Sequence, residues 1–190
     1  MERPNTNPLG LMAFAVTTMT LMFVETGWVR NDDFKDLVSC SALFFGGLVQ
    51  LVAGLIDLVA GDTFGTALAG FGAYWLSWGF LQLKVAEGVY SDATTFKTGM
   101  QLYLSLWGCF ALTFFSLTLR KSRCLQVTFG SATLTFFLLA AGQRNATVNK
   151  LGGYVGLVNG MAAFYTAAAD MAQQTYGVAM PGMKKRLQVQ

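Results

Sequence analysis

The sequence lacks histidine entirely, and its three cysteines form no CxxC or other metal-binding spacing: they are Cys40, Cys109 and Cys124. Zinc and iron sites need several such ligands at characteristic separations, so we expect no metal site. No nucleophile–histidine pair and no phosphate-binding glycine loop is present either. The residues therefore give no support to an enzyme or to a bound cofactor.

Charge is also scarce. Only 12% of the 190 residues are charged, about half the share that is usual for a soluble domain, whereas 54% are apolar. The net charge of +3 is too small to indicate a nucleic-acid partner. The lead-in has one arginine and no clear cleavage site, so we do not interpret it as a signal peptide. The composition predicts an integral membrane protein.

What the chain has instead is a series of long apolar runs. A spanning helix needs about 20 apolar residues, and the runs are continuous rather than alternating, which favours helices over a barrel. We expect an all-α integral membrane protein, a six-transmembrane-helix bundle forming a single domain over 1–190. The expected helices are 9–29, 37–60, 67–83, 99–119, 124–142 and 151–173, followed by a C-terminal tail at 174–190.

Six spans place both ends of the chain on the same side of the membrane. The basic cluster of Arg120, Lys121 and Arg123 lies in a very short connection on that side. Cytoplasmic connections carry an excess of lysine and arginine. We therefore expect both ends to be cytoplasmic, in a multi-pass protein of the plasma membrane.

Small residues recur at helical spacing in two of the runs. They include Gly47 and Gly54 in the second run, and the double GxxxG of Gly152, Gly156 and Gly160 in the sixth. Glycines at this spacing let helices approach closely in lipid, so we expect helix packing and a homo-oligomer. Gln50 and Asn159 accompany these glycines. A buried amide must be paired or face water, so each is either a packing partner or a path-lining group.

Three acids lie near the ends of the runs: Glu25, Asp57 and Asp170. Acids inside membranes often carry protons, but acids near helix ends are also commonly solvated or paired. Both interpretations stay open for each. On the first run, Gly10, Phe14, Thr17 and Glu25 share one helical face.

The stretch NTNPLGL precedes the first run. Asn7 is a favourable helix cap, and Pro8 suits the first helical position. The start of such a helix presents unpaired N–H groups and a positive dipole end, which together can receive a carboxylate without a charged side chain. The alternative is that the stretch is only a cap.

These residues also carry a family resemblance. NTNPLGLMAF resembles the NPAPLGL signature of the acetate uptake transporter family, which includes bacterial succinate–acetate permeases and fungal acetate and ammonia transport proteins. FFGGLVQLVAGLIDLVAGDTFG is similar to the family's second helix and following loop, and FGAYW to its aromatic stretch in the third. YLSLWGCF and LQVTFGSATLTFFLLAAG match the fourth and fifth helices in pattern, so the resemblance covers nearly the whole chain in order.

The resemblance implies a hexamer whose protomers each contain a path for acetate, and sometimes succinate. It also implies an apolar constriction at Phe14, Phe71 and Ala132. A larger leucine is usual at the last position. The smaller alanine at 132 either leaves the constriction wider, or Phe129 or Phe136 takes over the role of the leucine.

We therefore predict a proton-linked transporter or channel for acetate and related small carboxylates. The expected path begins at the start of the first helix and follows polar groups along the bundle. Its residues are Asn5, Asn7, Pro8, Leu9, Gly10, Thr17, Gln50, Tyr74 and Asn159. Two alternatives stay open: a channel for small neutral solutes such as urea or ammonia, and a structural or sensory membrane protein without flux.

Overall fold

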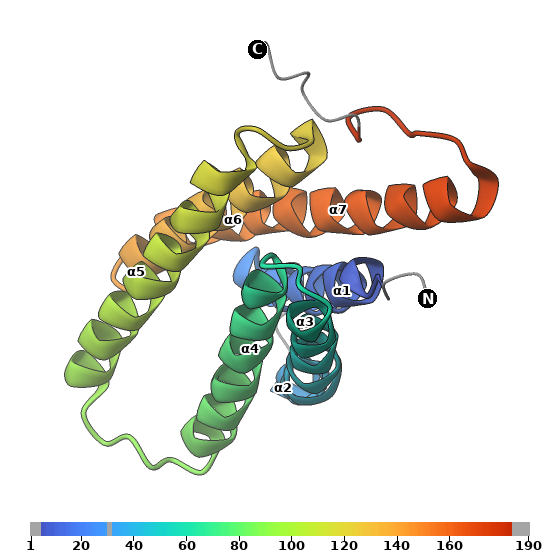
Figure 1. The fold of residues 1–190 in the computed structure, drawn as a ribbon. Coiled ribbons are helices and arrows are strands. Elements are labelled where there is room, and N and C mark those ends of the chain that lie inside the picture. The colour runs from blue at the N-terminus through green and yellow to red at the C-terminus, as the bar shows by residue number, and fades with distance from the viewer. Residues whose placement is uncertain (1–4, 30–31, 184–190) are drawn as a thin grey trace.

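The computed structural model describes residues 5–29 and 32–183, so the last part of the predicted tail, 184–190, lies outside the described residues. The elements are α1 (Asn7–Glu25), α2 (Asp32–Leu43), η1 (Phe44–Val49), α3 (Gln50–Val59), α4 (Gly65–Ala86), α5 (Ala93–Thr118), α6 (Arg123–Gly142) and α7 (Ala146–Tyr176). Because α2, η1 and α3 follow one another without a break, the chain forms six long helices (Figure 1). The prediction of an all-α, six-helix bundle is confirmed.

Length and hydropathy identify four membrane-spanning candidates among the described residues. They are Asn7–Glu25, Phe34–Val59, Ala93–Thr118 and Arg123–Gly142. The other two long helices, α4 and α7, are long enough but are rich in glycine and alanine. Both pack against other helices of the bundle, where such residues are tolerated.

The helices do not coincide with the apolar runs, because caps and glycines set where a helix begins and ends. Helix α5 begins at Ala93, six residues before the apolar run, where the Asp92 carboxylate accepts hydrogen bonds from two backbone N–H groups. Asn145 caps α7 in the same way. The first helix is shorter than expected and ends at Glu25, since Gly27 follows with a φ of 76°.

The second span contains a π-helical segment, η1, which the apolar pattern did not indicate. Its sequence, FFGGLV, includes two adjacent glycines that touch different neighbours. A Cβ at Gly46 would meet the Thr17 side chain of α1, and one at Gly47 would meet Leu76 of α4. Wide turns of this kind occur frequently at functional sites.

Glycines bring the backbones of α3 and α4 into direct contact. A Cβ on Gly54 would overlap the backbone nitrogen of Ala69, and one on Gly65 would lie 2.5 Å from the Gly54 carbonyl oxygen. No larger side chain fits this contact, so the pair of glycines fixes how closely the two helices approach.

The double GxxxG of α7 packs within the chain rather than against another copy. Positions 156 and 160 face Met22 and Met19 of α1, and position 152 faces Leu139 of α6. These glycines are therefore already covered, and they do not support the oligomer that their spacing led us to expect.

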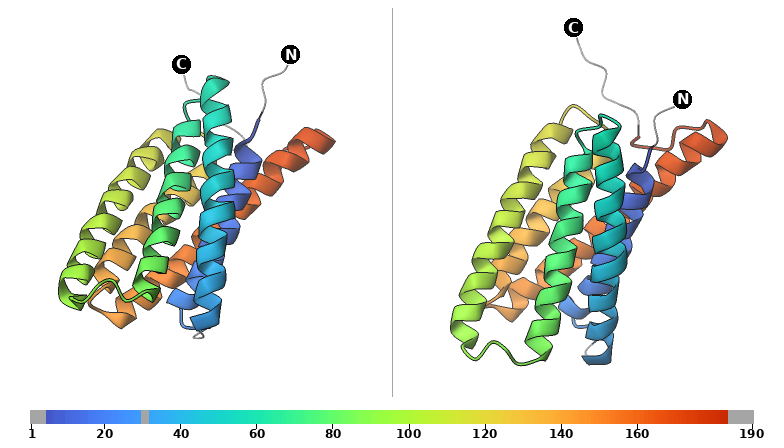
Figure 2. Two further views of the ribbon diagram at one scale, coloured as in Figure 1. Left: turned by 90° about the horizontal axis from the view of Figure 1, so that it is seen from below. Right: turned by 60° about the horizontal axis from the view of Figure 1, so that its bottom comes forward.

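Both described ends of the chain lie at the same end of the bundle (Figure 2). Helix α7 crosses the others obliquely, and its C-terminal part projects beyond them. The α5–α6 connection lies at the end where the chain begins and finishes, and the α4–α5 connection lies at the opposite end.

The α3–α4 contact predicts unequal effects of one substitution at two glycines. Gly54→Ala should destabilise the protein by about 1–3 kcal/mol or more, because overpacking forces two backbones apart. Gly99→Ala is the matched control, since a Cβ there has nothing within 4 Å. Heating detergent-solubilised protein and following the surviving folded fraction by size-exclusion chromatography measures both. Equal melting temperatures would show that the contact adds nothing to stability.

Candidate functional site

A cluster of aromatic rings closes the centre of the bundle. The Phe71 ring of α4 lies 5.4 Å from that of Phe14 in α1, measured between ring centroids. Two rings of α5 and two of α6 complete this aromatic cluster around it: Phe110 at 5.2 Å, Trp107 at 6.2 Å, Phe136 at 6.0 Å and Phe129 at 6.4 Å. Four helices thus each contribute one or two rings to this aromatic cluster.

Two of the predicted constriction residues, Phe14 and Phe71, are therefore neighbours in the structure. Ala132 is buried on α6, one turn from Phe129 on one side and from Phe136 on the other. The ring of Phe136 is nearly parallel to that of Phe71, with an angle of 8° between their planes. The small side chain at 132 thus lies in a place that larger rings already cover.

A cavity of about 200 Å³ lies between this cluster and the end of the bundle that carries both chain ends. We call it the terminal vestibule. It is lined by Asn7, Leu11, Asp62, Phe64, Lys121, Ser122, Leu125, Thr166, Asp170 and Met183. The rings of Phe64, Phe114 and Phe129 lie against one another at its inner end, with centroids about 6 Å apart.

Three successive residues at the start of α1 each bond a different carboxylate. The Asn5 amide donates to Asp170 of α7 at 3.1 Å, and the Asn7 amide donates to Asp62 at 3.3 Å. The backbone N–H of Thr6 donates to the buried Asp57 Oδ1 at 3.1 Å. The first helix is therefore held at its start by three acids, two from the end of α3 and the loop after it and one from α7.

The cap of α1 lies one residue earlier than expected. Thr6 is the N-cap, and Asn7 is already the first helical residue. The reason is that the Asn5 side-chain oxygen accepts the Asn7 N–H, whereas the Asn7 side chain is used in its bond to Asp62. A carboxylate does bind at this helix start, but it is the protein's own Asp57.

The Asp57 side chain is almost fully buried. The Thr6 hydroxyl lies 2.7 Å from its Oδ1 and also 2.7 Å from the Ala53 carbonyl oxygen, so one hydrogen serves two acceptors. Its other oxygen, Oδ2, has no hydrogen-bond partner within the described chain. Asp57 is thus a structural anchor of α1 and does not line either vestibule.

Lys121 is the cation of the terminal vestibule. Its ammonium lies 3.9 Å from the centroid of the Phe64 ring, a cation–π contact. The wall of this cavity thus combines one ammonium with the carboxylates of Asp62 and Asp170, which are already bonded to asparagine amides. Among residues 5–29 and 32–183, no cluster of three side chains suited to a metal ion occurs.

A second cavity, of about 170 Å³, lies at the opposite end of the bundle. We call it the distal vestibule. It is lined by Leu21, Glu25, Tyr74, Trp78, Gln82, Val85, Phe96, Met100, Leu104, Leu139, Gln143 and Asn149. The Asn149 amide donates to the Glu25 carboxylate at 2.6 Å, and Tyr74 closes the inner end with its ring 5.1 Å from Phe136.

The order of residues along each helix places the cluster between the two cavities. On α1, Leu11 lines the terminal vestibule, Phe14 belongs to the cluster and Leu21 lines the distal vestibule. Helix α6 shows the same order, from Leu125 through Phe129 and Phe136 to Leu139. The arrangement is two polar-lined cavities with a dry aromatic barrier between them.

Other residues of the expected path lie outside both cavities. The Thr17 hydroxyl is 3.1 Å from that of Ser41 in α2, and Asn159 accepts a hydrogen bond from Ser131 of α6. Gln50 is fully buried, and neither amide atom has a partner among the described residues. Pro8 is buried and Gly10 packs on Leu68, whereas Leu9 faces outward.

Several lining residues were not singled out from the sequence. Asp62 and Phe64 belong to the GDTFG segment, which was quoted only as a family motif. Gln143 and Asn149 flank the α6–α7 connection and look like ordinary loop polarity in the sequence. Only the closeness of five helices in space reveals that they share a cavity with Glu25.

The chain is similar to known proteins over nearly its whole length. The sequence profile of the GPR1/FUN34/yaaH family matches residues 2–183. The succinate–acetate/proton symporter SatP of Escherichia coli (strain K12) is 36% identical over 176 residues, which cover 91% of each chain. Acetate permease A of Emericella nidulans is 34% identical over 187 residues, covering 90% of this chain and 62% of that one.

A solved structure agrees with the fold described above. The structure of the bacterial acetate channel SatP superposes with a TM-score of 0.88 at 33% sequence identity, covering 96% of this chain and all of the other. The resemblance that the sequence motifs indicated is confirmed, and the chain belongs to the GPR1/FUN34/yaaH family.

Proposed function

We propose that this protein carries acetate and related small carboxylates, including succinate, across a membrane, and that the path through each chain joins the two vestibules. The observation that carries the proposal is the aromatic cluster between two polar-lined cavities at opposite ends of one bundle. The names of the relatives, a succinate–acetate/proton symporter, an acetate permease and an acetate channel, supply the substrate class.

The direction of uptake follows from the proposed orientation. The α5–α6 connection with Arg120, Lys121 and Arg123 lies at the same end of the bundle as both described chain ends. If this basic end is cytoplasmic, as the positive-inside rule favours, the distal vestibule faces outward. The start of α1 then lies at the inner mouth, where a carboxylate leaves the path during uptake.

The barrier favours the neutral form of the acid. An ionised carboxylate loses its hydration among rings that offer no charged partner, whereas the protonated acid loses much less. Narrow apolar segments of this kind also restrict conduction by excluding water. The aromatic cluster therefore selects acetic acid over acetate for the crossing itself.

The outer mouth contains a group suited to supply the proton. Glu25 lines the distal vestibule beside Asn149, and Tyr74 lies between this vestibule and the cluster. In the proposed cycle, Glu25 takes a proton from the outer solution and gives it to an arriving carboxylate, and the neutral acid crosses. On the inner side the acid releases its proton to the solution, and the Lys121 ammonium stabilises the carboxylate that forms.

A channel for small neutral solutes is the second candidate, because one observation favours it. Lys121 is the only cation among the described residues that line either vestibule. A neutral solute such as urea or ammonia would not need a second cation along the path. Protein-dependent urea or ammonia flux in liposomes without protein-dependent acetate flux would establish this alternative.

The assembly and the cellular membrane are proposed on separate grounds. A hexamer follows from the family resemblance alone, and the plasma membrane follows from an uptake role. Cross-linking in membranes followed by mass measurement tests the first, and fluorescence imaging of a tagged chain in cells tests the second.

Acidification should raise uptake steeply. Carboxyl pKa values lie near 4, so above that pH the neutral fraction of acetic acid rises about tenfold for each pH unit that the outer solution falls. Labelled acetate uptake into proteoliposomes, with the uptake of empty liposomes subtracted, should follow this fraction until it saturates. Protein-dependent uptake that ignores external pH would mean that the anion crosses unaided.

Opening the aromatic cluster should relax selectivity. Phe71→Ala removes the ring that touches all the others, so succinate uptake should rise several-fold relative to acetate uptake. Phe80→Ala is the matched control, because this α4 ring is 62% exposed and lies outside the cluster. Competition by carboxylates of increasing length measures the ratio. An unchanged rate together with an unchanged substrate range would remove Phe71 from the constriction.

Neutralising the outer acid should slow uptake without uncoupling it from the proton gradient. Glu25→Gln keeps a hydrogen-bonding partner for Asn149 but cannot supply a proton, so the carboxylate must take its proton from the outer solution and uptake should fall several-fold. Acetate exchange at equal pH on both sides should fall by a similar factor, because each crossing requires the neutral acid. Glu87→Gln, a surface carboxylate paired with Lys84, serves as control. An unchanged uptake rate in the Glu25 variant would restrict Glu25 to a structural role.

A further inference from the structure

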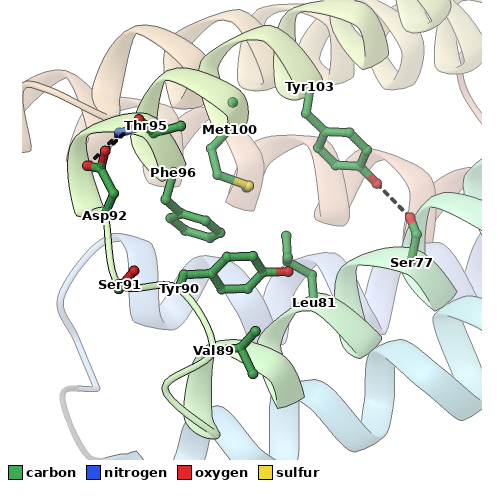
Figure 3. Close-up of a pocket in the computed structure, with 11 residues that line it drawn as sticks. Ser77, Leu81, Val89, Tyr90, Ser91, Asp92, Thr95, Phe96, Met100 and Tyr103 are labelled. Carbon is green, nitrogen blue, oxygen red and sulfur yellow. Dashed lines mark hydrogen bonds between the residues drawn. The ribbon is translucent and has the colours of Figure 1, made fainter.

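A third cavity, larger than either vestibule, lies beside the proposed path, not on it. It has a volume of about 570 Å³ and lies between the end of α4 and the start of α5 (Figure 3). We call it the side cavity. Its lining residues are Ser77, Leu81, Val89, Tyr90, Ser91, Asp92, Thr95, Phe96, Gly99, Met100 and Tyr103. None of them is fully buried, so the cavity opens on the outside of the bundle.

Most polar groups of the side cavity are already bonded to the protein. The hydroxyls of Ser77 and Tyr103 are 2.6 Å apart, and the Ser77 hydroxyl also donates to the Tyr74 carbonyl oxygen. At the opposite end, the Asp92 carboxylate accepts the Thr95 hydroxyl and the N–H groups of Thr94 and Thr95. The surface left to an occupant is mainly that of Leu81, Val89, Phe96 and Met100, together with the Tyr90 ring (Figure 3).

The charge of the side cavity is unfavourable for a carboxylate. The Thr95 hydroxyl, followed by the backbone N–H groups, holds the pKa of Asp92 below its ordinary value. Asp92 therefore remains negative at neutral pH, and no lysine or arginine is among the lining residues. The substrate anion is thus excluded, and the free hydrogen-bonding groups needed to bind a neutral acid are few.

The surroundings of the side cavity are those of a lipid-facing surface. Next to it on α4 lies Phe80, and next to it on α5 lie Leu102 and Leu106, each more than 60% exposed. The helices that border it belong to a membrane protein. Because hydrocarbon is what surrounds apolar side chains at this surface, hydrocarbon is also what is available to fill the opening between them.

Phe96 and Met100 line the side cavity and the distal vestibule alike. These two side chains thus form a wall between the side cavity, on the outside, and the distal vestibule, on the inside. We propose that the side cavity binds an acyl chain of a membrane lipid, which packs against Phe96 and Met100 and supports this wall of the distal vestibule. Lipid binding here is independent of which solute the protein carries.

Photo-cross-linking from lipid tests the proposal. The full chain is placed in nanodiscs of phosphatidylcholine that include a small share of phosphatidylcholine with a diazirine on one acyl chain. After irradiation, mass spectrometry maps the adducts. They should be several-fold more frequent at Leu81, Val89 and Met100 than at exposed apolar residues elsewhere, such as Val127 and Leu134 of α6.

Filling the cavity provides the matched comparison. Gly99 lines the side cavity, and a Cβ at this position would have no atom within 4 Å. A larger side chain can therefore enter the cavity, so Gly99→Trp should displace the acyl chain and reduce these adducts several-fold. Leu102→Trp, on the outward face of α5, should leave them unchanged. Gly99→Leu repeats the test with a smaller side chain should the tryptophan variant not fold.

Two results would overturn the proposal. Adducts at the cavity no more frequent than at Val127 and Leu134, or equally frequent in the Gly99 variants, would show that no chain occupies it. Disulfide cross-links between copies that carry a cysteine at position 81 would show that a second copy covers the cavity instead. Neither result bears on acetate uptake, which the proteoliposome assay measures separately.

Discussion

The ring of Phe71 is the constraint on which the arrangement of the bundle depends. It contacts rings from α1, α5 and α6, so these helices are held together by large aromatic side chains rather than by close backbone contact. Each such pair contributes about 0.5–1.5 kcal/mol beyond the apolar area it buries. Glycines let the backbone of α3 approach α4 closely, and that of α7 approach α1. Between α4 and α5, aromatic rings fill the space and separate the two backbones. The cavities at both ends and the side cavity follow from that spacing.

The start of α1 shows how the same bundle uses charge. Asp57, Asp62 and Asp170 all bond the segment Asn5–Thr6–Asn7; the first two lie at the end of α3 and just after it, and the third lies in α7. Hydrogen bonds from neutral donors hold these carboxylates without a buried cation, which would itself be costly to desolvate. Lys121 contacts the Phe64 ring, and its ammonium lines the terminal vestibule.

The parts of this structure that could be predicted are those that local sequence determines. Hydropathy located the six segments, and five motifs in register, beginning with that at Asn5 to Leu11, indicated the family. The cap was displaced by one residue because Asn7 bonds Asp62, 55 positions later in the sequence, and no local preference contains that information. The same holds for Glu25 with Asn149 and for the rings that cover Ala132. The π-helical turn at Phe44–Val49 depends on two neighbours at once, Thr17 and Leu76, so it too required the tertiary structure.

The aromatic cluster also bears on whether a protein of this kind is a channel or a symporter, since relatives carry both names. The side chains of the cluster are hydrocarbon rings and one indole, so none of them can carry a proton from one vestibule to the other. A proton that accompanies the substrate through this barrier must therefore travel on the substrate itself. A passive path for the neutral acid then moves one proton with each carboxylate, and its flux depends on the proton gradient as a symporter's does. The two descriptions differ only in whether the barrier opens alternately, because the coupling itself comes from the cost of dehydrating an anion.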